Sequence, residues 1–285
     1  MENEEGEVVS QWSEVARYWE KHREIINVMF APVTEALVQD AGIGSGHAVL
    51  DVATGPGEPA LTIAGLVGSR GEVLGIDIVP GMVEAAGREA DRRRLGNVRF
   101  ETAPAGKLPA GNDTFDAAVS RFGVMFFPSP LDGIREMLRV LKPGGKLAMA
   151  VWHFAENNPF HYVLSRIVGR FVDSPPPDPD SPDAFRFAPP GMLLHVVRQA
   201  GAVDVNERLL KFAIEVPLPA EDFWTLRYEM SDKIRAKLGP LAEDQIAEIR
   251  REFMETVRAY SGGNGLSFPA EVLIVSGRKL GHTQT

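Results

Sequence analysis

Acids and glycines that can hold a nucleotide-like ligand lie close together in one run of the chain. Asp51 follows three apolar residues, and Gly55 and Gly57 come shortly after it. Glycines at the end of a buried strand let the backbone turn tightly and approach a ligand without Cβ collisions. A second acid, Asp77, lies near the end of the next apolar run, residues 72–78. The pattern predicts a strand, a glycine loop and a helix that together bind a nucleotide-like ligand.

The loop distinguishes two classes of ligand. Residues 55–60 match G-x-G-x-x-A, the dinucleotide fingerprint. However, Pro56 and Pro59 have no N–H to donate to a pyrophosphate. Glu58 and Asp51 add negative charge where the phosphates would lie. The residues therefore favour a cationic ligand, and an NAD-dependent oxidoreductase is kept as the alternative.

This run resembles the first motif, D-x-x-x-G-x-G, of class I S-adenosylmethionine-dependent methyltransferases. Further matches follow in order: "GIDIVPGMVEAA", "FDAAVSRFGVMFF" and "MLRVLKPGGKLAMAVW". They cover residues 48–152, and the chain is similar to the small-molecule branch that includes ubiquinone and menaquinone biosynthesis methyltransferases. The resemblance implies S-adenosyl-L-methionine as cofactor, whose sulfonium cation agrees with the charge argument.

The resemblance also implies roles for individual residues. Asp51 would help to hold the ammonium group, and Asp77 would accept both ribose hydroxyls, with a helix cap as the alternative. Ile78 and Met82 would pack against the adenine, although either is also a normal core residue. The implied cofactor-binding residues are Trp19, Asp51, Ala53, Gly55, Gly57, Asp77, Ile78, Met82, Ala105, Gly106, Ser120, Arg121 and Phe122.

One segment departs from the family pattern, and one residue has two possible roles. The family often has an acid after its third strand that contacts the adenine, but this chain has "TAPAGKLP" there, at residues 102–109. Backbone groups of Ala105 and Gly106 would replace that contact. Arg121 would either bind a substrate anion or pair with a nearby acid, and both alternatives stay open.

Methyl transfer is an in-line displacement, to which a general base adds typically ~10²–10⁴-fold. Of the six histidines, His153 is the best candidate base, because it directly follows the strand predicted over residues 146–152. A hydrogen-bonded spacer is the alternative reading of His153. In a later helix, five residues are candidates to line an apolar acceptor pocket or to pack the helix onto the core: Phe223, Trp224, Leu226, Tyr228 and Met230.

Strand and helix patterns alternate through the first half of the chain. The fold class is therefore α/β, with a Rossmann-like, mostly parallel seven-stranded sheet flanked by helices and a helical cap. One helix is predicted around Trp12 to Trp19, and another after Pro32. The predicted segments are an N-terminal helical lid (1–45), a cofactor-binding core (46–154, 190–216 and 266–280) and helical cap or substrate-binding insertions (155–189 and 217–265).

The composition of the chain excludes several classes of partner and of binding site. The 285 residues carry a net charge of −9 and no cysteine, which argues against nucleic-acid partners, disulfides and thiolate metal sites. No apolar run is long enough for a membrane span or a signal peptide, so a cytoplasmic monomer or homodimer is expected. We predict S-adenosylmethionine-dependent O- or C-methylation of an apolar or aromatic small-molecule acceptor, without a metal. A non-methylating protein that binds the same cofactor is a further alternative.

Overall fold

The sheet places the ligand-binding end of the molecule. The computed structural model describes residues 2–172, 181–263 and 265–281. The strand order is β3-β2-β1-β4-β5-β8-β6, and the two-residue β7 pairs with β8 beside this path. Neighbouring strands from β3 to β5 pair in parallel, whereas β8 is antiparallel to β5 and β6. The predicted Rossmann-like, mostly parallel sheet is confirmed. The strands are β1 (Ala48–Val52), β2 (Glu72–Asp77), β3 (Val98–Thr102), β4 (Phe115–Arg121), β5 (Leu141–Trp152), β6 (Val203–Val216), β7 (Ser261–Gly262) and β8 (Gly265–Arg278).

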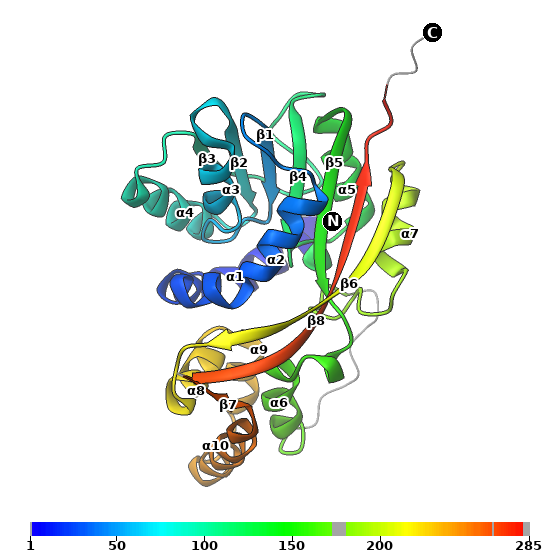
Figure 1. Ribbon diagram of the computed structural model, residues 1–285. Helices are drawn as coiled ribbons and strands as arrows, with labels where there is room; N and C mark the ends of the chain where they lie inside the picture. The colour runs from blue at the N-terminus through cyan, green and yellow to red at the C-terminus, as the bar shows by residue number, and fades with distance from the viewer. Residues whose placement is uncertain (1, 173–180, 264, 282–285) are drawn as a thin grey trace.

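The helices form two groups (Figure 1). One group flanks the sheet: α2 (Arg23–Asp40), α3 (Ala60–Val67), α4 (Pro80–Arg93), α5 (Pro130–Val140) and α7 (Met192–Gln199). The other lies beyond the ends of the parallel strands, with α1 (Glu2–Lys21) between it and the sheet: α6 (Pro159–Val168), α8 (Ala220–Glu229), α9 (Asp232–Leu238) and α10 (Glu243–Val257). Short 3-10 turns span Gly68–Arg70, Val124–Phe126, Ala155–Asn157 and Arg258–Tyr260.

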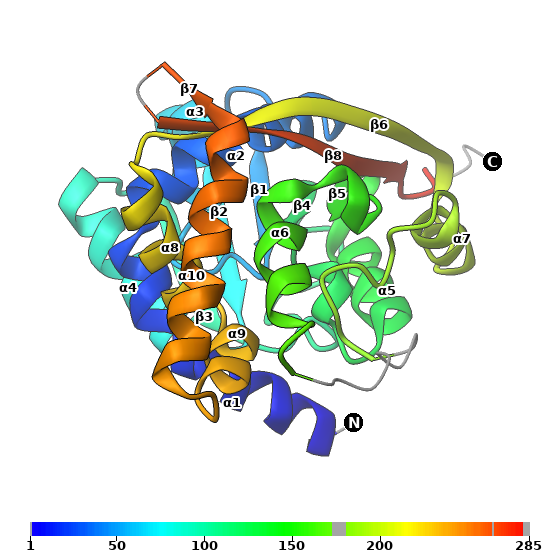
Figure 2. The ribbon, with the colours of Figure 1, turned by 90° about the horizontal axis from the view of Figure 1, so that it is seen from below.

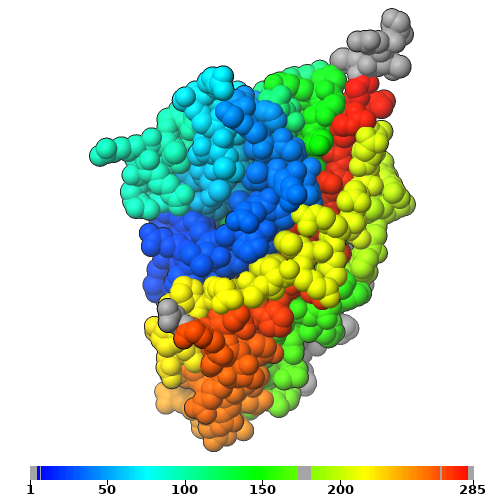
Figure 3. Space-filling view, in the orientation of Figure 1, coloured from blue at the N-terminus to red at the C-terminus, as the bar shows by residue number. Residues whose placement is uncertain are grey.

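Strands β6 and β8 connect the two groups. They pair continuously from Asn206 opposite Ser276 to Val216 opposite Leu266, and so extend well past the parallel strands. Figure 3 shows β6 as a yellow band that runs diagonally across one face of the molecule. Seen from below in Figure 2, α10 lies across the front of the cap helices. This ribbon holds the cap over the carboxyl ends of the parallel strands.

One hydrophobic core joins the sheet to the cap. The same buried cluster contains Leu50 of β1, Phe160 of α6 and Phe223 of α8. Burial of this apolar surface fixes the cap against the sheet, because each large buried side chain contributes about 1.5–3 kcal/mol. No helix within the described residues is long and apolar enough to cross a membrane.

Three predicted boundaries are wrong. The second helix begins at Arg23 and contains Pro32 in its interior, because its buried face, which includes Met29 and Val33, packs on the core. The later helix that carries Phe223 to Met230, whose pattern in the sequence runs over residues 222–237, is divided at Ser231. The Ser231 hydroxyl accepts the Ile234 amide and starts α9. Strand β5 begins at Leu141 rather than after the Pro-Gly-Gly run.

Candidate active site

A cavity of about 850 Å³ opens where β1 and β4 lie side by side. These strands are neighbours in the sheet although β2 and β3 come between them in sequence. Ligands of open α/β sheets bind at such a switch point, outside the carboxyl ends of the strands. The lining divides into two parts that we name here. The loop side comprises Trp19, Glu58, Met82 and residues 53–56, 76–79 and 103–107. The cap side comprises Trp152, Phe160, His161, Phe185, Arg227 and residues 230–234.

The two glycines of the loop have different roles. Gly55 lines the cavity at a φ of +55°, and a Cβ added there would meet no atom within 4 Å. Gly57, at a φ of +112°, does not line the cavity, and its Cβ would lie 2.6 Å from Leu61 Cδ1 and 3.2 Å from Ala86 Cβ. Gly55 therefore leaves space for a ligand, whereas Gly57 lets the loop pack against α3 and α4.

Asp77 lies at the end of β2 and lines the cavity. Its Oδ2 accepts a hydrogen bond from the Gly55 amide at 2.9 Å, and its Oδ1 accepts one from the Val79 amide at 3.0 Å. Burial raises the pKa of Asp77, and the amide bonds oppose that rise. Because each carboxylate oxygen can accept more than one hydrogen bond, the side chain is able to bind further donors in the cavity.

Asp51 lies behind the loop and does not line the cavity. Its Oδ2 accepts the Ala60 amide at 3.1 Å. Its Oδ1 is buried and has no hydrogen-bond partner among the described residues. Burial raises the pKa of Asp51 to about 7, although the nearby Thr54 hydroxyl and then the positive charge of Arg121 act in the opposite direction. A neighbouring cation would stabilise the ionised form of this carboxyl group.

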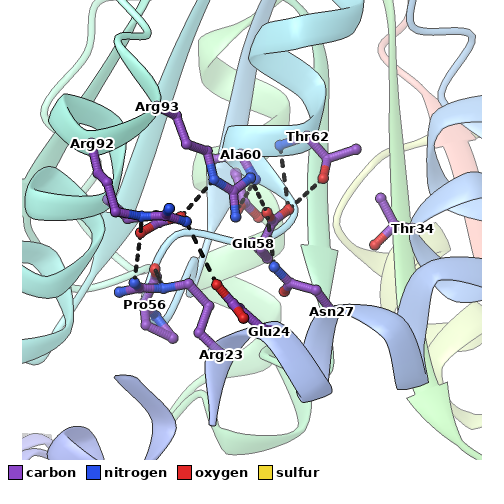
Figure 4. A network of polar contacts seen from close by, with 12 residues as sticks. Arg23, Glu24, Asn27, Thr34, Pro56, Glu58, Ala60, Thr62, Arg92 and Arg93 are labelled. Carbon is purple, nitrogen blue, oxygen red and sulfur yellow. Dashed lines mark hydrogen bonds and ion pairs between the residues drawn. The ribbon is translucent and has the colours of Figure 1, made fainter. Parts of the chain in front are cut away.

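Glu58 does not act as a free negative charge at the loop. It accepts hydrogen bonds from Arg93 at 2.9 Å, Asn27 at 3.2 Å and the Thr62 hydroxyl at 2.6 Å (Figure 4). The prediction that Glu58 makes the loop repel phosphate is therefore weakened, because Arg93 compensates its charge. The shortage of amide donors is confirmed: the Gly55 amide is taken by Asp77, and the Gly57 amide donates to the Thr54 carbonyl.

A buried arginine on α2 fixes the loop against α4. Arg23 donates to the Pro56 carbonyl at 3.1 Å, to the Ala85 carbonyl at 2.9 Å and to Glu89 at 3.0 Å. Arg92 and Arg93 also bind Glu89, and together with Arg23 they hold the pKa of Glu89 low, at about 2, against the opposing effect of its burial. The sequence gives no signal for this network, because its members come from three distant segments.

Arg121 and Phe122 follow β4, and both line the cavity. The Arg121 guanidinium donates to the Thr34 hydroxyl at 2.9 Å and to the Glu58 carbonyl at 3.3 Å. Neither partner is an acid side chain, although the charges of Glu58 and Asp51 act on this guanidinium, so both predicted roles of Arg121 stay predictions. Phe122 and Ala53 adopt left-handed backbone conformations, with φ of 61° and 60°. Such strain in residues other than glycine, of order 1–3 kcal/mol each, clusters at ligand sites.

The predicted adenine contacts lie on the loop side. Ile78, Met82, Ala105 and Gly106 all line the cavity. Ile78 and Trp19 pack against a small buried cluster that contains Met82, so α1 lies against the end of β2. The Trp19 Nε1 is buried and has no hydrogen-bond partner among the described residues. Trp19 lines the cavity, and its indole N–H is a donor that the described residues leave unused.

Besides Asp51 and Gly57, two further predicted site residues lie outside the lining. Ser120 is fully buried in β4. His153 Nδ1 lies 2.8 Å from Glu271 Oε2 and 3.1 Å from the Asn157 side-chain amide. Glu271 also binds Lys211. This position agrees with the alternative of a hydrogen-bonded spacer and does not support the predicted role of His153 as base.

The cap contributes different residues from those predicted. Phe223, Trp224 and Leu226 are buried in the core, and Tyr228 is exposed, so only Met230 of the five lines the cavity. Sequence reasoning missed Phe160, His161, Phe185 and Arg227. Arg227 had a usable signal: it shares a helix face with the apolar residues Phe223 and Met230, at i, i+4 and i+7. A charged residue on a buried face indicates a function or a buried partner.

The comparisons with known proteins agree with this geometry. Residues 49–145 match the model of the methyltransferase domain family, so the resemblance seen in the motifs is confirmed over this part of the chain. The ubiquinone/menaquinone biosynthesis C-methyltransferase UbiE of Azotobacter vinelandii is 32% identical over 166 residues, 55% of this chain and 63% of that protein. The chain thus spans less than two thirds of that relative.

Solved structures share the fold over most of the chain. The YcgJ protein of Bacillus subtilis superposes with a TM-score of 0.57 at 19% identity, and the match covers 87% of this chain and 97% of that one. The [4+2]-cyclase SpnF gives a TM-score of 0.54 at 20% identity, over 94% of this chain and 97% of that one. At these identities the likeness establishes the architecture alone.

Proposed function

We propose that the chain catalyses methyl transfer from S-adenosyl-L-methionine to a small-molecule acceptor. The observation that carries the proposal is the Asp77 carboxylate, which lies at the end of β2 and faces a loop that offers few amides. A carboxylate there suits the vicinal hydroxyls of a ribose. An amide-poor loop suits a ligand without phosphates. The similarity of residues 49–145 to methyltransferase domains supports the same cofactor.

The unsatisfied groups of the loop side fit this cofactor. The Trp19 indole N–H and the space in front of Gly55 face the cavity, and the Asp51 carboxylate lies directly behind the loop. When bound, the cofactor supplies an electrophilic methyl group on a sulfonium cation. Asp77 would bind the ribose, Ile78 and Met82 would hold the adenine, and Asp51 would stabilise the positive charge.

The main contribution of the protein to the reaction is to align the acceptor with the transferred methyl group. The cavity continues from the loop side past Phe122 to the cap side, so an acceptor bound there would face the transferred group. Proximity and orientation supply about 7–11 kcal/mol in well-aligned reactions, so no covalent intermediate with the protein is needed. We propose that residues 1–45 act as a lid, residues 46–154, 190–216 and 266–280 as the cofactor-binding core, and residues 155–189 and 217–265 as the acceptor-binding cap.

The acceptor that we propose is apolar or aromatic, methylated on oxygen or carbon. The aromatic walls of the cap side support it, and the relative from Azotobacter vinelandii is itself named a C-methyltransferase of quinone biosynthesis. We propose that the protein acts in the cytoplasm, as a monomer or homodimer, without nucleic acid as a partner.

Calorimetry with adenosylhomocysteine and with NAD tests the cofactor. We expect micromolar binding of adenosylhomocysteine and none of NAD, and the reverse would contradict the proposal. Transfer of a labelled methyl group to aromatic acceptors then tests the reaction. Binding of adenosylhomocysteine without transfer to any acceptor would favour a non-methylating protein that uses the same cofactor.

A further inference from the structure

A positive charge is buried on the cap side with no acid beside it. Arg227 of α8 is 8% exposed and lines the cavity. Within residues 2–172, 181–263 and 265–281 it makes no hydrogen bond or ion pair, and its Nε is buried and unpartnered. Burial alone lowers its pKa to about 10. An unpaired buried charge is costly, so a protein rarely keeps one without a use for it.

The other buried arginines at this cavity differ in this respect. Arg23 binds Glu89 at 3.0 Å, and Arg121 lies in the field of Glu58 and Asp51. Each is therefore compensated by the chain itself. Arg227 instead rests on an aromatic ring, with its Cζ 4.6 Å from the centroid of Phe160. Among the described residues no acid compensates this guanidinium, so its charge is open to a ligand in the cavity.

A second unsatisfied group lies next to Arg227. His161 of α6 packs its ring against the same Phe160 ring, with centroids 5.1 Å apart. Its Nε2 is buried and has no hydrogen-bond partner among the described residues. Burial, together with the charge of Arg227, lowers the pKa of His161 well below 6.5. The imidazole is therefore neutral near neutral pH and can donate or accept one hydrogen bond.

Flat aromatic side chains surround these two groups. Trp152 lies 4.4 Å from the His161 ring and stacks on Phe122 at 4.3 Å with an angle of 3° between the planes. Phe185 contacts the other side of His161, at 5.8 Å between centroids. Of the other charges on the cap side, Lys233 is paired with Asp183 at 3.0 Å. Such walls bind planar rings by stacking and edge contacts.

We propose that the cap side binds a planar aromatic acceptor through an oxyanion, either a carboxylate or a phenolate, that pairs with Arg227 and hydrogen-bonds to His161. This inference rests on the proposed function, because it names the acceptor class of the same site. The oxyanion supplies the negative charge that would pair with Arg227, and the ring packs against the aromatic side chains that line the cap side. A phenolate would also enrich the ring in electrons, which suits a methyl acceptor, whereas a carboxylate would serve to anchor the ring.

Matched pairs of probes test the charge requirement. Naphthoate and naphthamide differ in the carboxylate, and para-nitrophenolate and para-nitroanisole differ in the phenolate, at about pH 8. Calorimetry on the full chain saturated with adenosylhomocysteine should show at least one anion binding about tenfold more tightly than its neutral partner. The pair that shows the preference identifies the oxyanion. Equal binding within both pairs, or binding of no anion, would overturn the proposal.

Substitutions at Arg227 assign the preference to this residue. Arg227→Met should abolish it, and Arg227→Lys should retain part of it. Arg166→Met is the matched control, because Arg166 lies on exposed α6 surface outside the cavity lining. Loss of the preference in the control as well, or its survival in Arg227→Met, would refute the assignment.

Two further measurements separate the possible failures. Without a probe, Arg227→Met should melt no lower than the original chain, because it removes an unpaired buried charge. A marked loss of stability would show that Arg227 has a structural role instead. Affinity for adenosylhomocysteine should be equal in all these variants; absence of such binding in the original chain would defeat the proposed function, whereas normal binding without an anion preference would defeat only this inference.

Discussion

The loop side and the cap side of the cavity satisfy their polar groups in different ways. On the loop side, Asp77 and Glu58 each accept two or more hydrogen bonds from the chain. On the cap side, Arg227 and the Nε2 of His161 have no partner among the described residues. The comparison indicates that the chain itself holds the acids of the loop side in place, whereas the charge of Arg227 on the cap side is left for a ligand to compensate. An unpartnered donor, the Trp19 Nε1, occurs on the loop side as well.

The largest effect is expected from Asp77 on the loop side. Asp77→Ala should weaken binding of adenosylhomocysteine about 100-fold, or about 3 kcal/mol, because it removes the proposed ribose acceptor and frees two amides. Asp77→Asn keeps one oxygen and should lie in between. Calorimetry measures the affinity and thermal unfolding the stability. Unchanged affinity in Asp77→Ala would show that the cofactor does not lie at β2.

The two loop glycines should separate stability from affinity. Gly57→Ala should destabilise the protein by about 2 kcal/mol in urea unfolding, because its Cβ collides with Leu61 and Ala86 at a positive φ. Gly55→Ala meets no atom, so it should cost less stability but reduce cofactor affinity by intruding on the cavity. The opposite pattern would reverse the roles assigned to these two residues.

Asp51 should make cofactor binding depend on pH. The folded-state pKa of Asp51, about 7, lies above the ordinary 3.8. The contribution of this carboxyl group to folding stability is therefore full below about pH 4 and is lost as the pH rises through 7. A bound cation favours the ionised form, so affinity for S-adenosylmethionine should rise about tenfold from about pH 6 to pH 8. Asp51→Asn should flatten this profile in calorimetry. A steep profile that survives in Asp51→Asn would assign the dependence to another group.

The smallest effect is expected at His153. Because its ring contacts Glu271 and Asn157 outside the cavity lining, His153→Gln should change the rate constant of methyl transfer less than about twofold. Steady-state kinetics with the labelled cofactor measures it. A loss of about 100-fold would restore His153 as the base and would show that the cavity extends farther than its lining indicates.

Local patterns predicted the loop side well. The run from Asp51 to Gly57, the acid at Asp77 and the position of Phe122 all lie at or directly after the ends of strands that the hydropathy pattern identifies. The carboxyl ends of parallel strands meet at one edge, so finding the strands is enough to bring these residues together. The pattern did not reveal that Gly57 packs against α4 or that Arg93 compensates Glu58, because those contacts join separate segments.

By itself, the sequence determined the parallel sheet, the glycine loop and the acids beside it, because strand periodicity and backbone conformation are local properties. Only the tertiary structure decided which residues of the cap face the cavity. The β6–β8 ribbon carries α8 over the sheet, and its packing buries Phe223 while it turns Arg227 toward His161. Which side chains of the cap face the cavity depends on how apolar surfaces from distant segments pack together. The sequence of α6 or of α8 alone does not determine it.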